Sequence, residues 1–134
     1  MNPALYTVIQ NVEQLQAMRD NLAANYLLGN HIDASATTSW NGGAGFVPVG
    51  DGANRYAGSF DGLGHTLSNL TIDRSSTDYV GLFGATGSGS VIRDIGLVGG
   101  SISGRDHVGG LVGVNSGIIS NAYATGSVEH CIQA

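Results

Sequence analysis

A short pattern recurs along the second half of this 134-residue chain, and it limits the possible folds more than any other feature. Its three copies begin at residues 66, 91 and 118, so they are spaced by 25 and 27 residues. In each copy the second, fifth and seventh positions are apolar, and the fourth is Asn or Asp. A repeat of this length indicates a solenoid, in which each repeat buries its apolar face against its neighbours. The copies are Thr66–Ile72, Val91–Leu97 and Ile118–Ala124.

The spacing within each copy predicts a strand that turns a corner. A plain strand would place apolar residues at every second position, whereas here the alternation slips by one at the Asn or Asp. These two residue types tolerate the left-handed backbone conformation that such a corner requires. We therefore expect Asn69, Asp94 and Asn121 to stack as a ladder of corner residues. A second repeated element, Val80–Gly84 and Gly109–Gly113, lies between the copies. An antiparallel sandwich, the competing fold, gives no reason for this period.

The N-terminal third predicts a cap for the solenoid. Val12, Leu15, Met18 and Leu22 share one face of a helix over 11–22, with Asn11 as its N-cap. Strands are expected at Tyr6–Ile9, Tyr26–Leu28 and His31–Asp33. An uncovered solenoid end exposes unpaired backbone, and the helix is suited to cover it.

Composition excludes several classes of protein. With 42% apolar and only 11% charged residues, the chain does not have the composition of a disordered protein. A net charge of −5 without a basic cluster argues against nucleic-acid binding. No apolar stretch is long enough for a membrane helix, so membrane insertion is not expected. No signal peptide is visible, and the single cysteine, Cys131, allows no internal disulfide.

The repeats resemble a known family. Residues 109–128 are similar to the GLUG repeat of large bacterial surface proteins, including filamentous-haemagglutinin-like adhesins exported by two-partner secretion. Residues 60–70 and 30–35 resemble the segments that precede such repeats. The resemblance implies an all-β, right-handed parallel β-helix that is secreted or displayed at the cell surface. It also implies a larger parent chain, of which this sequence would be a fragment.

We expect one β-helix domain over 1–128. It divides into a cap and first coil (1–35), an irregular loop-rich coil (36–64) and GLUG-like coils (65–128), followed by a tail over 129–134.

No catalytic constellation is apparent, so we predict that the chain is not an enzyme. Glycoside hydrolysis requires two carboxylates that face one groove. Asp61 and Asp94 are better explained as turn formers. The adjacent opposite charges Asp73–Arg74, Arg93–Asp94 and Arg105–Asp106 are expected to be solvated loop pairs. The histidines are too far apart in sequence to suggest a metal site, and the glycine runs complete no phosphate-binding motif. No cofactor or metal is expected.

Aromatic residues cluster in the segment that departs most from the repeat. Insertions in solenoids often form binding loops, so Trp40 and Tyr56 are candidates for stacking on a glycan, whereas Phe46 and Phe60 are expected to fill the core. The favoured function is an adhesive or scaffolding segment that contacts a host-surface glycan or protein. The alternatives are a stalk without binding activity, an accessory region beside a domain such as a protease, and a polysaccharide-active enzyme.

Overall fold

The structure is a computed structural model that describes residues 6–130. It is an all-β fold with one short α-helix, α1 (Val12–Gln16), and two 3-10 segments, η2 (Ala17–Asp20) and η3 (Ser35–Gly43). The strands are β1 (Tyr6–Ile9), β2 (Asn25–Leu28), β3 (Ile32–Asp33), β4 (Ser59–Asp61), β5 (Thr66–Ser68), β6 (Thr71–Asp73), β7 (Phe83–Thr86), β8 (Val91–Val98), β9 (Ser101–Gly104), β10 (Val112–Asn115), β11 (Ile118–Ala124) and β12 (Ser127–His130).

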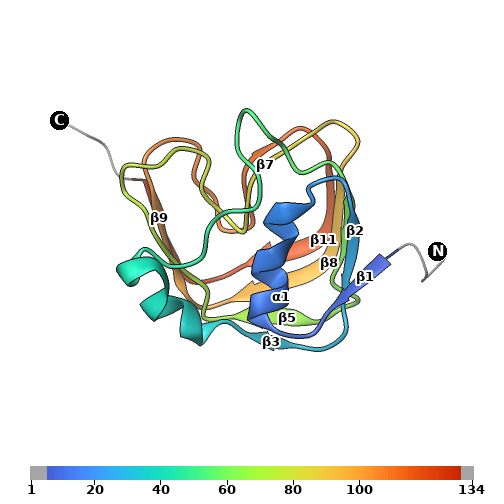
Figure 1. Cartoon of the computed structure of the whole chain (residues 1–134), viewed down its shortest axis with the longest axis horizontal. Helices are drawn as coiled ribbons and strands as arrows, with labels where there is room; N and C mark the ends of the chain where they lie inside the picture. Colours follow the sequence, from blue (N-terminus) through green and yellow to red (C-terminus); the bar gives the residue numbers. More distant parts are fainter. Residues whose placement is uncertain (1–5, 131–134) are drawn as a thin grey trace.

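The strands form three sheets, and every pairing between named strands in the described chain is parallel. The first sheet contains β1, β2, β4, β8, β5 and β3, with β11 added on β8. The second contains β6, β9 and β12, and the third β7 and β10. From β4 onward the chain passes through the first, second and third sheets in that order and then begins again. We call each such passage a circuit; successive circuits lie side by side (Figure 1).

The register between the last two circuits confirms the repeat that the sequence predicts. Ile118 pairs with Val91, Val128 with Ile102, and Val112 with Phe83, so one circuit takes 26 to 29 residues. The repeated Val80–Gly84 and Gly109–Gly113 elements lead into the paired strands of the third sheet, which begin at Phe83 and Val112. Strand β12 continues through His130, two residues into the segment that the sequence assigns to the tail; Cys131 and the residues after it lie outside the described chain.

The register of the earlier copy differs from the sequence prediction. Leu67 pairs with Leu97, whereas the 25-residue spacing would have aligned it with Ile92. It is Phe60, from the preceding strand, that pairs with Ile92. The cause is an insertion: four residues link Asp61 to Thr66, whereas Asp94 and Ile95 alone span the equivalent distance in β8.

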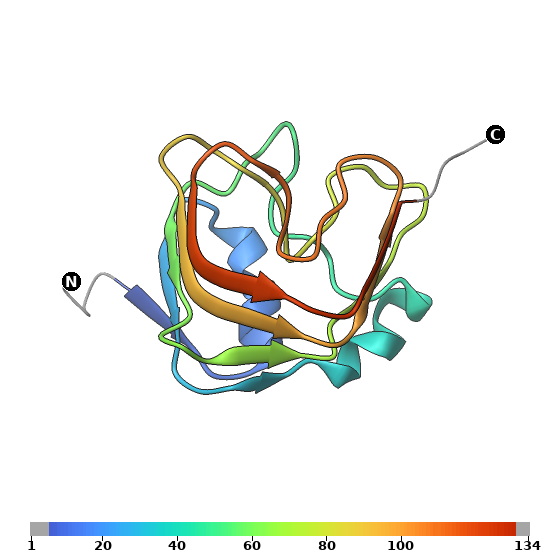
Figure 2. The same cartoon turned by 180° about the vertical axis from the view of Figure 1, so that it is seen from behind.

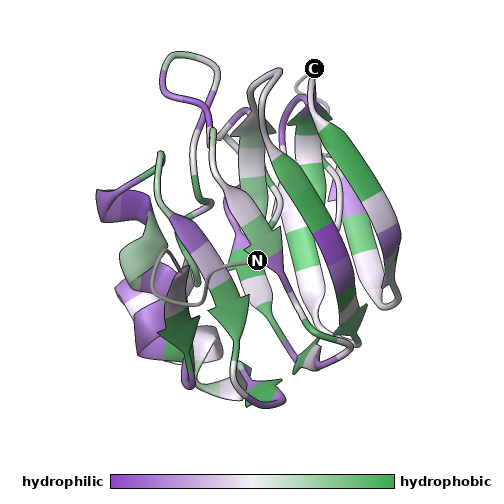
Figure 3. Cartoon of the chain, turned by 90° about the vertical axis from the view of Figure 1, so that its right-hand side faces the viewer, coloured by the Kyte–Doolittle hydropathy of each residue, from purple (hydrophilic) through white to green (hydrophobic). Residues whose placement is uncertain are grey.

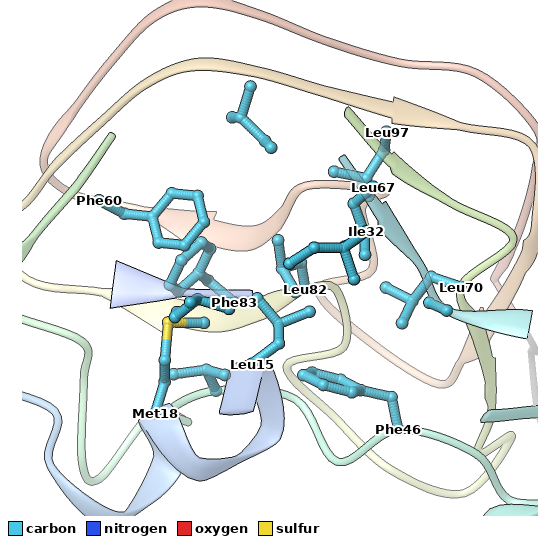
Figure 4. Close-up of a cluster of buried hydrophobic side chains, with 14 of the residues drawn as sticks. Leu15, Met18, Ile32, Phe46, Phe60, Leu67, Leu70, Leu82, Phe83 and Leu97 are labelled. Carbon is cyan, nitrogen blue, oxygen red and sulfur yellow. The ribbon is translucent and has the colours of Figure 1, made fainter. Parts of the chain in front are cut away.

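Apolar side chains from all three sheets fill the space inside the circuits. The predicted positions Leu67, Leu70, Ile92 and Ile95 are each at most 2% exposed. Figure 4 shows part of this core, with Phe46, Phe60 and Phe83 among the aliphatic side chains. Outward positions alternate with these, and Figure 3 shows the resulting bands of apolar and polar residues along neighbouring strands.

The predicted helix forms and covers one end of the core. Asn11 is its N-cap: the side chain accepts a hydrogen bond from the Gln14 backbone N–H at 2.8 Å, and the Gln14 side chain accepts one from the Gln10 N–H at 2.7 Å. The apolar face is buried, with Leu15 and Met18 fully so, and both point toward the core (Figure 4). The helical conformation becomes 3-10 at Ala17 and ends at Asp20, two residues before the predicted end.

Candidate functional site

The two predicted glycan-binding aromatics are not together on a surface. Tyr56 is fully buried, with its ring 4.8 Å from that of Phe83 and its hydroxyl donating to the Ala24 carbonyl at 3.2 Å. Burial raises the pKa of the Tyr56 hydroxyl. Trp40 is partly buried against the core, at a kink in η3. Tyr56 therefore offers no ring face to a ligand, which corrects the expectation for this residue: its ring packs in the core beside Phe83.

The predicted corner ladder is correct for two of its three residues. Asp94 and Asn121 occupy the same corner of successive circuits, with φ values of 54° and 51°. Asn69 also has a left-handed backbone, with φ of 59°, but its register places it beside Gly99, at the next corner along the chain. The residue that shares the first corner with Asp94 is in the inserted turn, where Leu63 has φ of 54°. Because both corners favour residues that tolerate positive φ, the sequence pattern alone confuses them.

Two ion pairs of the described residues join charged side chains of different circuits. Arg93 donates to the buried Asp61 carboxylate at 3.1 Å, while Asp61 also accepts from the Leu63 backbone N–H at 2.9 Å. Arg105 makes a two-pronged contact with Asp78, with both distances 2.8 Å, which lowers the pKa of the Asp78 carboxyl. Asp61 thus has the turn-forming role expected from the sequence. Arg93 and Arg105 form these ion pairs with aspartates of the preceding circuit.

Arg74 lies apart from these pairs, against the loop that follows η3. Its guanidinium donates to the backbone carbonyls of Phe46 and Gly45 at 3.3 Å. Burial, together with the nearby positive charge of Arg19, lowers the pKa of Arg74. Within residues 6–130, no group of three or more His, Cys, Asp or Glu side chains is arranged to hold a metal ion.

The two ends of the stacked circuits differ. Helix α1 lies across the end formed by the early strands (Figure 1), whereas the circuit containing β10, β11 and β12 forms the outermost layer at the other end (Figure 2). Ile119 and Val128 are 38% and 46% exposed, although their register partners Ile92 and Ile102 belong to the core. We call this surface the open end. The sequence did not reveal it, because Ile119 and Val128 fit the core pattern as well as their buried partners do.

Two of the hollows on the surface of the described residues carry polar groups relevant to ligand binding. The larger, of about 640 Å³, separates η2 from the loop around Asp51 and carries side chains of both charge signs, including Arg19 and Asp20. The smaller, of about 140 Å³, lies at the first corner on the outer face. Its lining includes His65, Asp94, Asn121 and Tyr123, and we call it the corner groove.

The motif family assigned from the sequence matches the last circuit. Residues 104–129, from the end of β9 through most of β12, match the family model described as the GLUG motif. The chain therefore contains a region similar to the GLUG motif. The matched residues therefore include the strands of the open end and the Asn121 and Tyr123 side of the corner groove.

Two relatives and one solved structure are similar to nearly the whole chain. Halomucin of Haloquadratum walsbyi is 41% identical over 132 residues, which cover 91% of this chain and 1% of halomucin. A provisionally named Gly-rich membrane protein of Evansella cellulosilytica is 35% identical over 125 residues, which cover 90% of this chain and 14% of that protein. A crystal structure from Bacteroides ovatus, provisionally named an immunoglobulin A1 protease, matches 95% of this chain with a TM-score of 0.76 and 26% identity.

This chain spans only a small part of each of these proteins. It covers 39% of the Bacteroides ovatus chain, and far less of the two relatives. Neither relative is named as a filamentous haemagglutinin. Among the helices of the described residues, none has the length and apolar character required to cross a membrane.

Proposed function

We propose that this chain is a structural segment of a secreted or surface-displayed protein, built as a right-handed parallel β-helix that accepts further circuits at its open end. The observation that carries the proposal is the contrast between the two ends. One end is covered by the buried face of α1, while the other presents apolar side chains in register with the core. An unpaired strand edge without charged inward residues favours the addition of another strand.

The surface location is supported by the names and sizes of the similar proteins. One is a halomucin, another is named as a membrane protein, and both are many times longer than this chain. A segment of repeats in a large surface protein acts as a scaffold, and the parent protein in our proposal is an adhesin of the filamentous-haemagglutinin type. Catalysis is not part of the proposal, since Asp61 and Asp78 are each held by an arginine.

The scaffold role can be tested by adding one circuit. In β12, His130 pairs with Gly104, so a copy that begins with Arg105 would continue the register if it were joined directly to His130. A variant with a second copy of residues 105–130 placed after His130 should stack this copy on the open end. Burying Ile119 and Val128 should then raise the melting temperature by about 3 °C or more, measured by circular dichroism.

A matched pair of substitutions provides the control. Ile119→Asp with Val128→Asp should change the stability of the natural chain little, because both side chains are partly exposed there. In the extended chain the same pair should abolish the gain, since each carboxylate would be buried without a partner. An extension that leaves the melting temperature unchanged, or a gain that survives the two aspartates, would contradict the proposal.

A further inference from the structure

We propose that the corner groove binds one neutral sugar unit of a polysaccharide, with the Tyr123 ring as the stacking surface and Asp94 and Asn121 as hydrogen-bond partners for its hydroxyls. The groove lies on the outer face, between β5 and β11 and over β8. It does not belong to the open end, so the inference goes beyond the scaffold role and stands without it.

The Tyr123 ring rests on the backbone of the neighbouring strand and forms a flat stacking surface. It pairs in register with Gly96 of β8, and its ring lies over the Gly96 Cα, in the space that a Cβ at position 96 would occupy. The ring is thus supported on one face, while the side chain remains 54% exposed. A fixed aromatic face loses little conformational entropy on binding and suits the apolar C–H face of a sugar ring.

Two polar side chains stand next to this platform. Asp94 and Asn121 occupy the same corner, and both are held there by a left-handed backbone conformation. The Asp94 carboxylate is half-buried and makes no side-chain hydrogen bond within the described residues; its neighbour Arg93 is engaged with Asp61. A half-buried carboxylate without a partner is a strong acceptor for hydroxyl groups.

His65 forms the opposite wall of the groove and is itself supported. Its ring lies edge-on to that of His31, with the centroids 4.9 Å apart. His31 is fixed in turn, because its Nδ1 accepts a hydrogen bond from the Thr66 backbone N–H at 2.9 Å. The wall, the platform and the acceptors therefore come from three successive circuits, and their spacing is set by the strand register.

The chemistry of the lining selects a neutral sugar. No Lys or Arg lines the groove, so the Asp94 charge disfavours an acidic sugar or a phosphate. One carboxylate is too few for a stable metal site. The volume of about 140 Å³ corresponds to about five water molecules, which is room for one sugar ring resting partly outside. Aromatic stacking with a few placed polar groups is the usual composition of such sites.

The test is a titration of the isotopically labelled protein, followed by amide NMR, with hexasaccharides of glucose, mannose and galactose and with oligogalacturonate as the acidic probe. We expect saturable shifts at residues 94–96 and 121–123 with at least one neutral probe and none with oligogalacturonate. Tyr123→Ala and Asp94→Gly should each weaken this binding at least tenfold. Glycine suits the positive φ at position 94, so the second variant removes the carboxylate without backbone strain.

Three further variants separate binding from folding. Ile118→Ala, a change on the same strand but outside the groove, should leave the affinity unchanged. Tyr123→Phe keeps the ring and should bind within threefold of the natural chain. Gly96→Ala should weaken binding while Tyr123 is still present, because the added Cβ displaces the ring. No binding to any neutral probe, preference for oligogalacturonate, or binding that persists in both Tyr123→Ala and Asp94→Gly would overturn the proposal.

Discussion

Leu63 has a backbone conformation that is unfavourable for its residue type. It has a φ of 54° in the turn that links β4 to β5, and its side chain is 47% exposed. A left-handed conformation costs a residue with a Cβ about 1 kcal/mol, and little of this is recovered by burial at such a site. The equivalent corner in the next two circuits has Asp94 and Asn121, which tolerate this conformation better.

Replacing Leu63 should therefore stabilise the protein. We expect Leu63→Asn and Leu63→Gly to raise the free energy of unfolding by about 0.5–1 kcal/mol in urea denaturation. Val98→Gly is the matched control, since Val98 is similarly exposed but has no positive φ and should lose stability. Destabilisation in both Leu63 variants would show that the side chain contributes packing which its exposure does not indicate.

The buried hydroxyl of Tyr56 makes the stability of the protein depend on pH. Its folded-state pKa is raised by burial above the unfolded value of about 10. The stabilisation from the protonated form is therefore complete below pH 10 and is lost as the pH rises above it. Tyr56→Phe should cost about 1 kcal/mol at neutral pH, through loss of the bond to the Ala24 carbonyl, and should reduce the fall in stability between pH 10 and 12. The same alkaline slope in both proteins would assign that slope to other tyrosines.

At the scale of the elements, close backbone contacts fix where glycine must occur. In β7, a Cβ on Gly84 would collide with the carbonyl oxygens of Gly50 and Tyr79, because the backbone at both residues packs closely against this position. Gly89, in the turn that follows, has open space around it. The glycines that look like a simple repeat in the sequence thus have different roles.

The two positions should respond differently to the same change. Gly84→Ala is expected to lower the free energy of unfolding by about 2–3 kcal/mol, because neighbouring backbone would have to move. Gly89→Ala should change it by less than about 0.5 kcal/mol. Thermal denaturation of the two variants beside the natural protein provides the comparison, and equal effects would mean that β7 can shift without cost.

Elements with a local signal could be predicted from the sequence, whereas those that depend on register could not. The α1 helix and its Asn11 cap are specified by residues within one turn, and both are confirmed. The sequence repeat placed Asn69 at the corner of Asp94, whereas the structure places it beside Gly99. The insertion between Asp61 and Thr66 causes this shift, because it changes the length of the circuit without altering the motif. Tyr123 was missed as a candidate site residue for another reason: the repeat aligns it with Gly96, but the sequence does not show that its ring lies over that glycine.

At the scale of the whole molecule, the circuits form a stack with one covered end and one open end. Sequence periodicity predicts such a stack, and the Val80–Gly84 and Gly109–Gly113 elements align as expected. The sequence also assigns α1 to the cap, whereas the contacts that its apolar face makes are a property of the assembled core. The corner groove also arises at this scale, since it is formed by residues of three circuits.

The register of the stack is the central claim, and the most direct test is disulfide formation between circuits. Ser68 and Val98 are paired outward positions on neighbouring strands, whose backbones lie about 5 Å apart, a separation that a disulfide can span. In a Cys131→Ser background, Ser68→Cys with Val98→Cys should oxidise fully under mild conditions, as judged by mass spectrometry. Ser68→Cys with Arg93→Cys, the pair implied by the 25-residue spacing, should remain reduced. Rapid oxidation of the second pair and not the first would contradict the register described above.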